Sequence, residues 1–303
     1  MPTAQKLTLA VLINAALISS VYASEQSEAK GFLEDASGSV LLRTGFIDRD
    51  KKNGVEDTRS TAQSAIFKLE SGYTQGIVGF GVGAVGDGSF KIGKNNHAGN
   101  QMIPLHNDGA KDANGHVDAY DHWARGGASV KARISNTEVR YGTQVLDLPV
   151  LASNTGRMVP EYFEGVLATS REINGLELTA GKFTKNQMSE QINTDGNKLD
   201  SAVVWGAKYK FNDAFNASYF GLDSKDKLDR HYVNANFKQA LANNSSLTYD
   251  FSGYHTKFDK NATTYSATGE VASDYGKTGV AGVEKTNNIW AISGTYNTGA
   301  HNI

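Results

Sequence analysis

The chain has 303 residues, a formal net charge of −2 and no cysteine. The near-neutral charge argues against a general nucleic-acid binder, which would carry a basic surface, and the lack of cysteine excludes disulfides and thiolate metal sites. Glycine is abundant at 32 residues and proline is scarce at 4, a composition that favours many twisted strands over helices.

The first residues have the pattern of a secretory signal. Lys6 supplies a positive start, residues 7–20 form an apolar stretch, and Val21-Tyr22-Ala23 ends in the small residue that signal cleavage needs. The alternative is a lone membrane anchor, which would need about 20 apolar residues and a basic flank. We therefore predict that residues 1–23 are a cleaved signal peptide and that residues 24–303 form one domain in the cell envelope.

Short segments in which every second residue is apolar recur along the rest of the chain. Successive side chains of a strand point to opposite faces, so each segment has one apolar face and one polar or glycine-rich face. The segments are residues 40–46, 65–70, 78–84, 128–134, 139–145, 166–171, 176–183, 203–210, 215–219, 232–237, 247–252 and 290–296. No segment shows helical periodicity, so the sequence predicts an all-β chain of about 12 strands.

The predicted connections differ in length on the two sides of this sheet. Tight turns at Asn174-Gly175 and Asn212-Asp213 contrast with long connections over residues 87–125 and 259–287. A secreted all-β chain of this kind is typical of an antiparallel outer-membrane β-barrel. The alternative is a secreted β-sandwich, such as an adhesin, but its apolar face should be dominated by leucine, isoleucine and valine. Here many apolar-face positions hold alanine, glycine, threonine or tyrosine.

The polar faces of the predicted strands carry many basic residues. The clearest cases are Lys131 and Arg133 in one segment and Arg140 in the next. The other basic residues predicted to face inward are Arg43, Lys68, Arg171, Lys208 and Lys210, and the acids are Glu70, Glu138, Glu177 and Asp250. Two interpretations remain open. The charges could neutralise one another on a wet inner wall, or the cations could form a ladder that lowers the barrier for a carboxylate in a narrow pore.

Other motifs give no support for catalysis. Residues 81–86 match G-x-G-x-x-G after a predicted strand, but no helix pattern follows, so the glycines are expected to leave room on an inward face. The seven histidines lack zinc-ligand spacing and are interpreted as solvated loop residues. No G-x-S-x-G elbow is present. We predict no catalytic residues, no metal, no cofactor and no enzyme activity.

One loop carries a distinctive motif. Residues 148–165 read LPVLASNTGRMVPEYFEG and resemble the pore loop of OprD-type substrate-specific porins of Pseudomonas and Acinetobacter, which has the pattern Leu-Pro-Val…Asn-Asp-x-Arg-Leu-x-Pro…Phe-x-Gly. The resemblance continues in GFLED (31–35), SGYTQG (71–76), PLHNDG (104–109) and LELTAG (176–181). It therefore extends over essentially the whole chain after residue 23.

The resemblance implies a barrel of roughly eighteen strands in the outer membrane, with a third long loop that folds inward as a constriction. It implies passive, electrostatically guided diffusion of small carboxylate-bearing solutes, such as amino acids, organic acids and, in some members, carbapenems. Arg157 would hold the substrate carboxylate, because a guanidinium grips it bidentately and keeps its charge. Lys131, Arg133, Arg140 and Arg43 complete the expected substrate-binding set. A non-selective general porin is the alternative.

The expected partners follow from the same resemblance. They are small anionic or zwitterionic solutes, outer-membrane lipid and lipopolysaccharide, and the barrel-assembly machinery, with the protein as a monomer or a loose trimer and with no nucleic acid. Two departures from the family stand out. Thr155 replaces an aspartate that is common in the family, which weakens the expectation of specificity for basic amino acids. The family also continues for several strands beyond Ile303, so we expect a barrel truncated at its C-terminus, with sheet edges that are costly in lipid.

Overall fold

The computed structural model describes residues 24–52, 54–98, 100–106, 110–194, 199–258, 262–265, 271–275, 286–298 and 301–302. The predicted signal peptide, residues 1–23, lies outside the described residues. Within them, no helix has the length and the apolar character required to cross a membrane.

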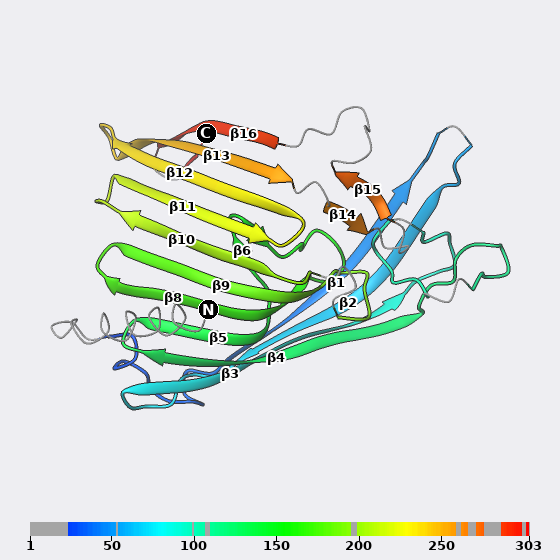
Figure 1. Ribbon diagram of the computed structural model, residues 1–303, viewed down its shortest axis with the longest axis horizontal. Helices are drawn as coiled ribbons and strands as arrows, with labels where there is room; N and C mark the ends of the chain where they lie inside the picture. Colours follow the sequence, from blue (N-terminus) through cyan, green and yellow to red (C-terminus); the bar gives the residue numbers. More distant parts are fainter. Residues whose placement is uncertain are drawn as a thin grey trace.

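One antiparallel sheet dominates the described part of the chain, and its 13 strands follow one another in chain order (Figure 1). The strands are β1 (Ser37–Arg49), β2 (Thr58–Glu70), β3 (Val78–Lys91), β4 (His122–Ile134), β5 (Thr137–Gln144), β8 (Tyr162–Ile173), β9 (Leu176–Gln187), β10 (Ala202–Lys210), β11 (Phe215–Ser224), β12 (Leu228–Ala240), β13 (Ser245–Phe258), β16 (Thr286–Thr298) and β17 (His301–Asn302). Two small hairpins pair separately: β6 (Asp147–Leu148) with β7 (Leu151–Ala152), and β14 (Ala262–Tyr265) with β15 (Val271–Tyr275). The all-β antiparallel prediction is confirmed.

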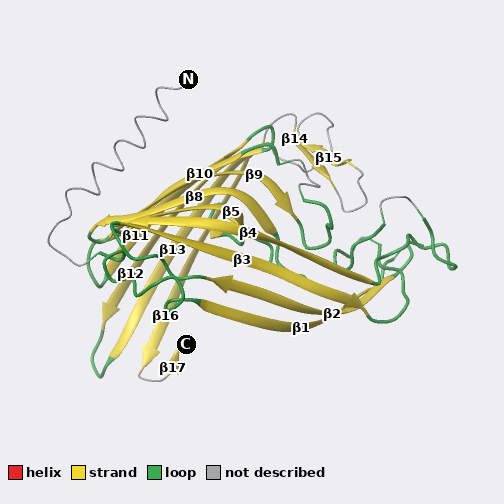
Figure 2. Ribbon diagram, turned by 90° about the horizontal axis from the view of Figure 1, so that it is seen from below, coloured by secondary structure: helices red, strands yellow, loops and turns green. Residues whose placement is uncertain are grey.

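The sheet bends into an arch, which Figure 2 shows from below. Its two end strands are β1 and β17, and these do not pair with each other within the described residues. The strands are joined by short turns at one end of the sheet and by long loops at the other. The long loops include residues 92–121, 145–161 and 188–201.

The predicted tight turns are confirmed. Gly175 has a φ of +78°, which glycine adopts at little cost, and it lies between the end of β8 and the start of β9. In the turn after β10, the Asn212 side chain accepts hydrogen bonds from the backbone N–H groups of Ala214 and Phe215, both at 2.9 Å. An asparagine that bonds its own following backbone stabilises a turn of this kind.

The two faces of the sheet differ as the alternation predicts. In β4, Val130 is 57% exposed, whereas its neighbour Lys131 is 7% exposed. Lys131 lies opposite Gly81 of β3 and Arg140 of β5, so these positions share one face. Gly81 is required there, because a Cβ at this position would lie 2.7 Å from the backbone carbonyl oxygen of Gly72. The predicted strand continues past the glycine motif to Lys91. Gly81 and Gly83 leave room on the inner face as predicted, whereas Gly86 has the opposite phase and lies on the outer face.

The predicted long connection over residues 87–125 is wrong in its bounds. β3 continues to Lys91 and β4 already begins at His122. The polar residues that seemed to end the strands lie on the inner face, where they find partners: Arg125 Nη2 lies 2.9 Å from Asp87 Oδ2, and Ser89 shares a hydrogen bond with a serine of β2. A polar residue does not end a strand when the face it points to is itself polar. The second connection, 259–287, contains β14 and β15, and part of it lies outside the described residues.

Candidate solute-binding constriction

The loop between β5 and β8, residues 145–161, is held to the inner face at two points. Its first half places Leu146 and Val150 in an apolar cluster with Phe183 of β9 and residues of β10 and β11. Its second half buries Met158 and Val159 in another cluster with residues of the β3–β4 loop. The segment 154–156 between them is exposed. The tip of the loop is therefore open to solvent while both of its ends are fixed by packing.

A buried carboxylate pins the base of the exposed tip. Glu161 accepts a hydrogen bond from the backbone N–H of Asn154 at 3.1 Å and another from the Asn186 side chain at 2.8 Å. The backbone N–H of Glu161 in turn donates to the carbonyl of Asn154 at 2.9 Å. Burial raises the pKa of the Glu161 carboxyl, and the nearby Glu190 carboxylate raises it further. These bonds close residues 154–161 into a small ring of fixed shape.

Arg125 of β4 ties the loop to the wall. Its guanidinium is fully buried against Asp87, whose side chain is also fully buried. It donates to the carbonyl of Pro160 at 2.8 Å and to the carbonyl of Met188, in the β9–β10 loop, at 2.6 Å. The Tyr162 hydroxyl completes the site by donating to Asp87 at 2.8 Å. Arg125 was not identified from the sequence as the residue that holds these loops to the wall.

The structure brings two of the predicted site residues, Arg43 and Arg157, together at the loop tip. Arg43 Nη1 donates to the carbonyl of Thr155 at 3.0 Å and to the carbonyl of Arg157 at 2.5 Å. Arg157 donates to the Gln101 side chain at 3.3 Å, and its buried Nε has no hydrogen-bond partner among the described residues. Both arginines line a recess of about 300 Å³. Arg43 thus holds the loop backbone, and Arg157 presents its guanidinium beside it.

A second pair of predicted site residues, Lys131 and Arg140, shares one acid. Glu70 lies 3.0 Å from Lys131 Nζ and 2.7 Å from Arg140 Nη1. Arg140 also lies 3.5 Å from Glu138. A recess of about 200 Å³ separates this group from residues 146–148 of the constriction loop. Two cations therefore share one bridging carboxylate directly under the loop.

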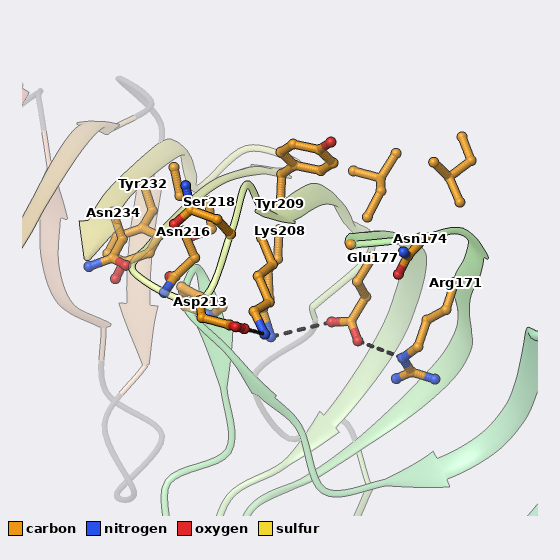
Figure 3. Close-up of a pocket in the computed structure, with 17 residues that line it drawn as sticks. Arg171, Asn174, Glu177, Lys208, Tyr209, Asp213, Asn216, Ser218, Tyr232 and Asn234 are labelled. Atoms are coloured by element: carbon orange, nitrogen blue, oxygen red, sulfur yellow. Dashed lines mark hydrogen bonds and ion pairs between the residues drawn. The ribbon is translucent and has the colours of Figure 1, made fainter. Parts of the chain in front are cut away.

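The remaining basic residues lie nearer the short turns. The guanidinium of Arg133 stacks on the ring of Tyr73, 4.1 Å from its centroid. A cavity of about 720 Å³ lies at this end of the sheet. Figure 3 shows that Glu177 lies there between Arg171 and Lys208. Glu177 is 2.8 Å from Arg171 and 3.4 Å from Lys208. Three of the predicted inner acids, Glu70, Glu138 and Glu177, thus pair with predicted inner cations, whereas Asp250 accepts hydrogen bonds from the side chains of two asparagines of β12.

One histidine of the β3–β4 loop is buried. His97 shares a hydrogen bond of 2.7 Å with Ser60 through Nδ1, and burial, helped by the Lys91 charge, lowers its pKa from 6.5 to about 4. This differs from the expectation of a solvated histidine. The described residues contain no group of three or more side chains that could hold a metal ion.

The buried His97 predicts a pH dependence. Because its pKa is lower in the folded loop, protons bind preferentially to the opened loop as the pH falls from 6.5 towards 4. We expect the loop to become more susceptible to limited proteolysis across that window in the wild type. A His97→Asn variant, which does not titrate, should show a flatter pH profile. Equal profiles for the two proteins would contradict this assignment.

Comparison with solved structures agrees with this architecture. The crystal structure of OccAB1 from Acinetobacter baumannii is similar with a TM-score of 0.80 and 73% sequence identity, over 92% of this chain and 66% of that one. A BenF-like porin from Pseudomonas fluorescens is similar with a TM-score of 0.72 and 28% identity, over 90% of this chain and 66% of that one. OpdK from Pseudomonas aeruginosa, solved with vanillate, has a TM-score of 0.69 and 27% identity, over 90% and 66%.

Sequence relatives point the same way. Porin D of Pseudomonas aeruginosa is 32% identical over 94% of this chain and 60% of its own length. The porin-like protein GalP of Pseudomonas putida is 32% identical over 72% of this chain and 54% of its own length. The chain thus spans a little over half the length of these two relatives. The model for "outer membrane porin, OprD family" matches residues 30–303. The chain belongs to the OprD family of outer-membrane porins, which are β-barrel channels rather than enzymes.

Proposed function

We propose that this protein allows passive diffusion of small carboxylate-bearing solutes across the outer membrane, guided by the charges of its inner face. The observation that carries the proposal is the juxtaposition of Arg43 and Arg157 at an open recess beside the exposed loop tip. Arg43 holds the loop backbone through one nitrogen, and Arg157 bonds the Gln101 side chain and the Gly156 carbonyl. A solute carboxylate would therefore meet both guanidinium groups in this recess, and Arg157 is the one that the loop motif singles out. A fixed guanidinium can replace part of the hydration shell of a carboxylate.

The bonded inner wall supports weak, sequential binding. A solute that leaves Arg157 meets Lys131 and Arg140, which already share Glu70. A carboxylate entering there exchanges with an internal acid instead of filling an empty, strongly attractive site. Conduction requires binding that is favourable enough to enter and weak enough to leave, and this exchange supplies such a balance.

The range of solutes extends the same proposal. A neighbour of this chain, OpdK, was solved with vanillate, a carboxylate. Amino acids and organic acids have the same group, and carbapenems also carry a carboxylate. These solute classes are part of the proposal. The proposal also includes removal of residues 1–23 and insertion by the barrel-assembly machinery among lipid and lipopolysaccharide. The inserted protein would be a monomer or a loose trimer.

Liposome swelling tests the proposal. Purified protein should admit a small carboxylate faster than a neutral sugar of similar size, and this preference should weaken as added salt screens the wall charges. A control with empty liposomes sets the leak rate. Equal rates for the two solutes would instead support a general, non-selective porin, and no swelling with either would contradict a transport role.

A further inference from the structure

The first described residues of the chain fold back against the short-turn end of the sheet. We name residues 24–36 the N-terminal latch. Gln26 is buried at 3% exposure, and its backbone N–H donates to the carbonyl of Ser135 in the β4–β5 turn at 3.1 Å. Its side-chain amide donates to the carbonyls of Thr74 and Gly76 in the β2–β3 turn, at 3.0 and 3.1 Å. Gln26 therefore bonds the latch to two neighbouring turns, to one through its backbone and to the other through its side chain.

The sheet has room for this side chain because β3 has a glycine beneath it. A Cβ at Gly79 would clash with the amide of Gln26. Gly79 lies opposite Arg133 in the sheet register, and Arg133 Nε donates to Gln26 Oε1 at 3.2 Å. Further along the latch, the backbone N–H of Gly72 donates to the carbonyl of Phe32 at 2.8 Å. The latch is thus seated on the wall by polar contacts along its length.

This seat places a carboxylate between two basic residues of the wall. Glu25 Oε2 lies 3.8 Å from Arg133 Nη1, and Glu25 Oε1 lies 3.5 Å from Arg171 Nη1. The backbone N–H of Glu25 donates to the side chain of Asn136 at 2.8 Å, which fixes its direction. Arg171 lines the cavity shown in Figure 3, together with Pro149 of the constriction loop. The latch therefore acts on the same face as the constriction.

We propose that Glu25 is an internal counter-ion for Arg133 and Arg171, and that the N-terminal latch thereby sets how strongly the short-turn end of the channel attracts anions. A carboxylate in transit would compete with Glu25 for the two guanidinium groups. The inference rests on the proposed function for its solute, but its effect on ion selectivity is measurable by itself. Glu25 is a specificity-determining residue in this scheme, and Gln26 is its positioning residue.

The test compares Glu25→Gln with Glu28→Gln in planar bilayers under a potassium chloride gradient. Both changes remove one negative charge from the latch, but Glu28 is exposed and has no ion pair among the described residues. Glu25→Gln should raise the chloride-to-potassium permeability ratio about four-fold in dilute salt, because one elementary charge roughly 10 Å away in water changes the permeability about two-fold for each ion and in opposite directions. Glu28→Gln should leave the ratio close to that of the wild type.

A steric variant tests the same inference without a change of charge. Gly79→Ala should displace the Gln26 amide, free Glu25 from the two arginines and raise the ratio in the same direction. Gly88→Ala on the same strand is its control, because a Cβ there meets open space. Equal ratios for wild type and Glu25→Gln, or equal shifts for Glu25→Gln and Glu28→Gln, would overturn the inference. If the wild type swelled equally with carboxylate and sugar while Glu25→Gln still shifted the ratio, the proposed function would fail and the latch would stand.

Discussion

Replacing Arg125 with methionine is expected to destabilise the protein by about 3–5 kcal/mol, because the change leaves the Asp87 carboxylate buried without its partner. The loss extends beyond the ion pair, since Arg125 also bonds the carbonyls of Pro160 and Met188. Those carbonyls belong to the constriction loop and to the β9–β10 loop, so both loops should loosen together. The midpoint of thermal unfolding can be measured by heating samples to graded temperatures and following the loss of the compact, heat-modifiable form on a gel.

Two matched variants separate this effect from a general loss of charge. Arg59 pairs with Asp48 at the surface, where its side chain is 56% exposed, and exposed pairs contribute only about 0–1 kcal/mol. Arg59→Ala should therefore change the midpoint little. The double change Arg125→Met with Asp87→Asn should recover part of the stability, because the amide oxygen can still accept from Tyr162. An Arg125→Met protein as stable as Arg59→Ala would refute the role assigned to this pair.

Replacing Arg157 with alanine is expected to weaken carboxylate binding in the channel about ten-fold or more, since a hydrogen bond to a charged group contributes roughly 1.5–3 kcal/mol. The concentration of a small carboxylate that half-blocks the single-channel current measures this. The loop should stay in place, because Met158 and Val159 keep it packed and Arg43 bonds backbone carbonyls that the variant retains.

The conservative change distinguishes charge from geometry at this position. Arg157→Lys keeps the positive charge but loses the planar fork that bonds a carboxylate bidentately. The carboxylate concentration that half-blocks its current should therefore lie between those of the wild type and Arg157→Ala. Arg59→Ala again serves as the control, because Arg59 is an exposed arginine of β2 that does not line the recess. If the same carboxylate concentration half-blocked the current of the wild type and of Arg157→Ala, the constriction hypothesis would be wrong. The fold and the family membership would not be affected.

The strands could be predicted from the sequence because the alternation of apolar and polar residues is a local property of the chain. Alternation in the segment around Val130 and Lys131 predicts opposite faces, and the structure exposes the first and covers the second. The predicted ends of β3 and β4 were wrong because the inner face is polar there. Asp87 and Arg125 read as loop residues, although Arg125 lies an even number of positions before Lys131 and so shares its face. This even spacing was the sign in the sequence that Arg125 points inward, where it pairs with Asp87.

The inward direction of the basic residues could be predicted from the sequence, but their grouping could not. The loop motif identified Arg157, and strand phase identified Lys131, Arg133, Arg140 and Arg43 as inward residues. The structure divides them into a loop-tip pair, a pair that shares Glu70, and Arg133 at the latch. Their solute contacts stay a prediction.

By itself the sequence determined which residues face the same side of each strand, the turns, and the membership of an outer-membrane porin family, because these depend on period, turn chemistry and motif order. Only the tertiary structure decided which acid neutralises which cation. It placed Glu25 against Arg171, 146 positions apart in the chain, and Arg43 against the carbonyl of Arg157, 114 positions apart. Charge pairing depends on distance in space, and distance across an arched sheet is set by strand register and loop packing, which no local pattern encodes.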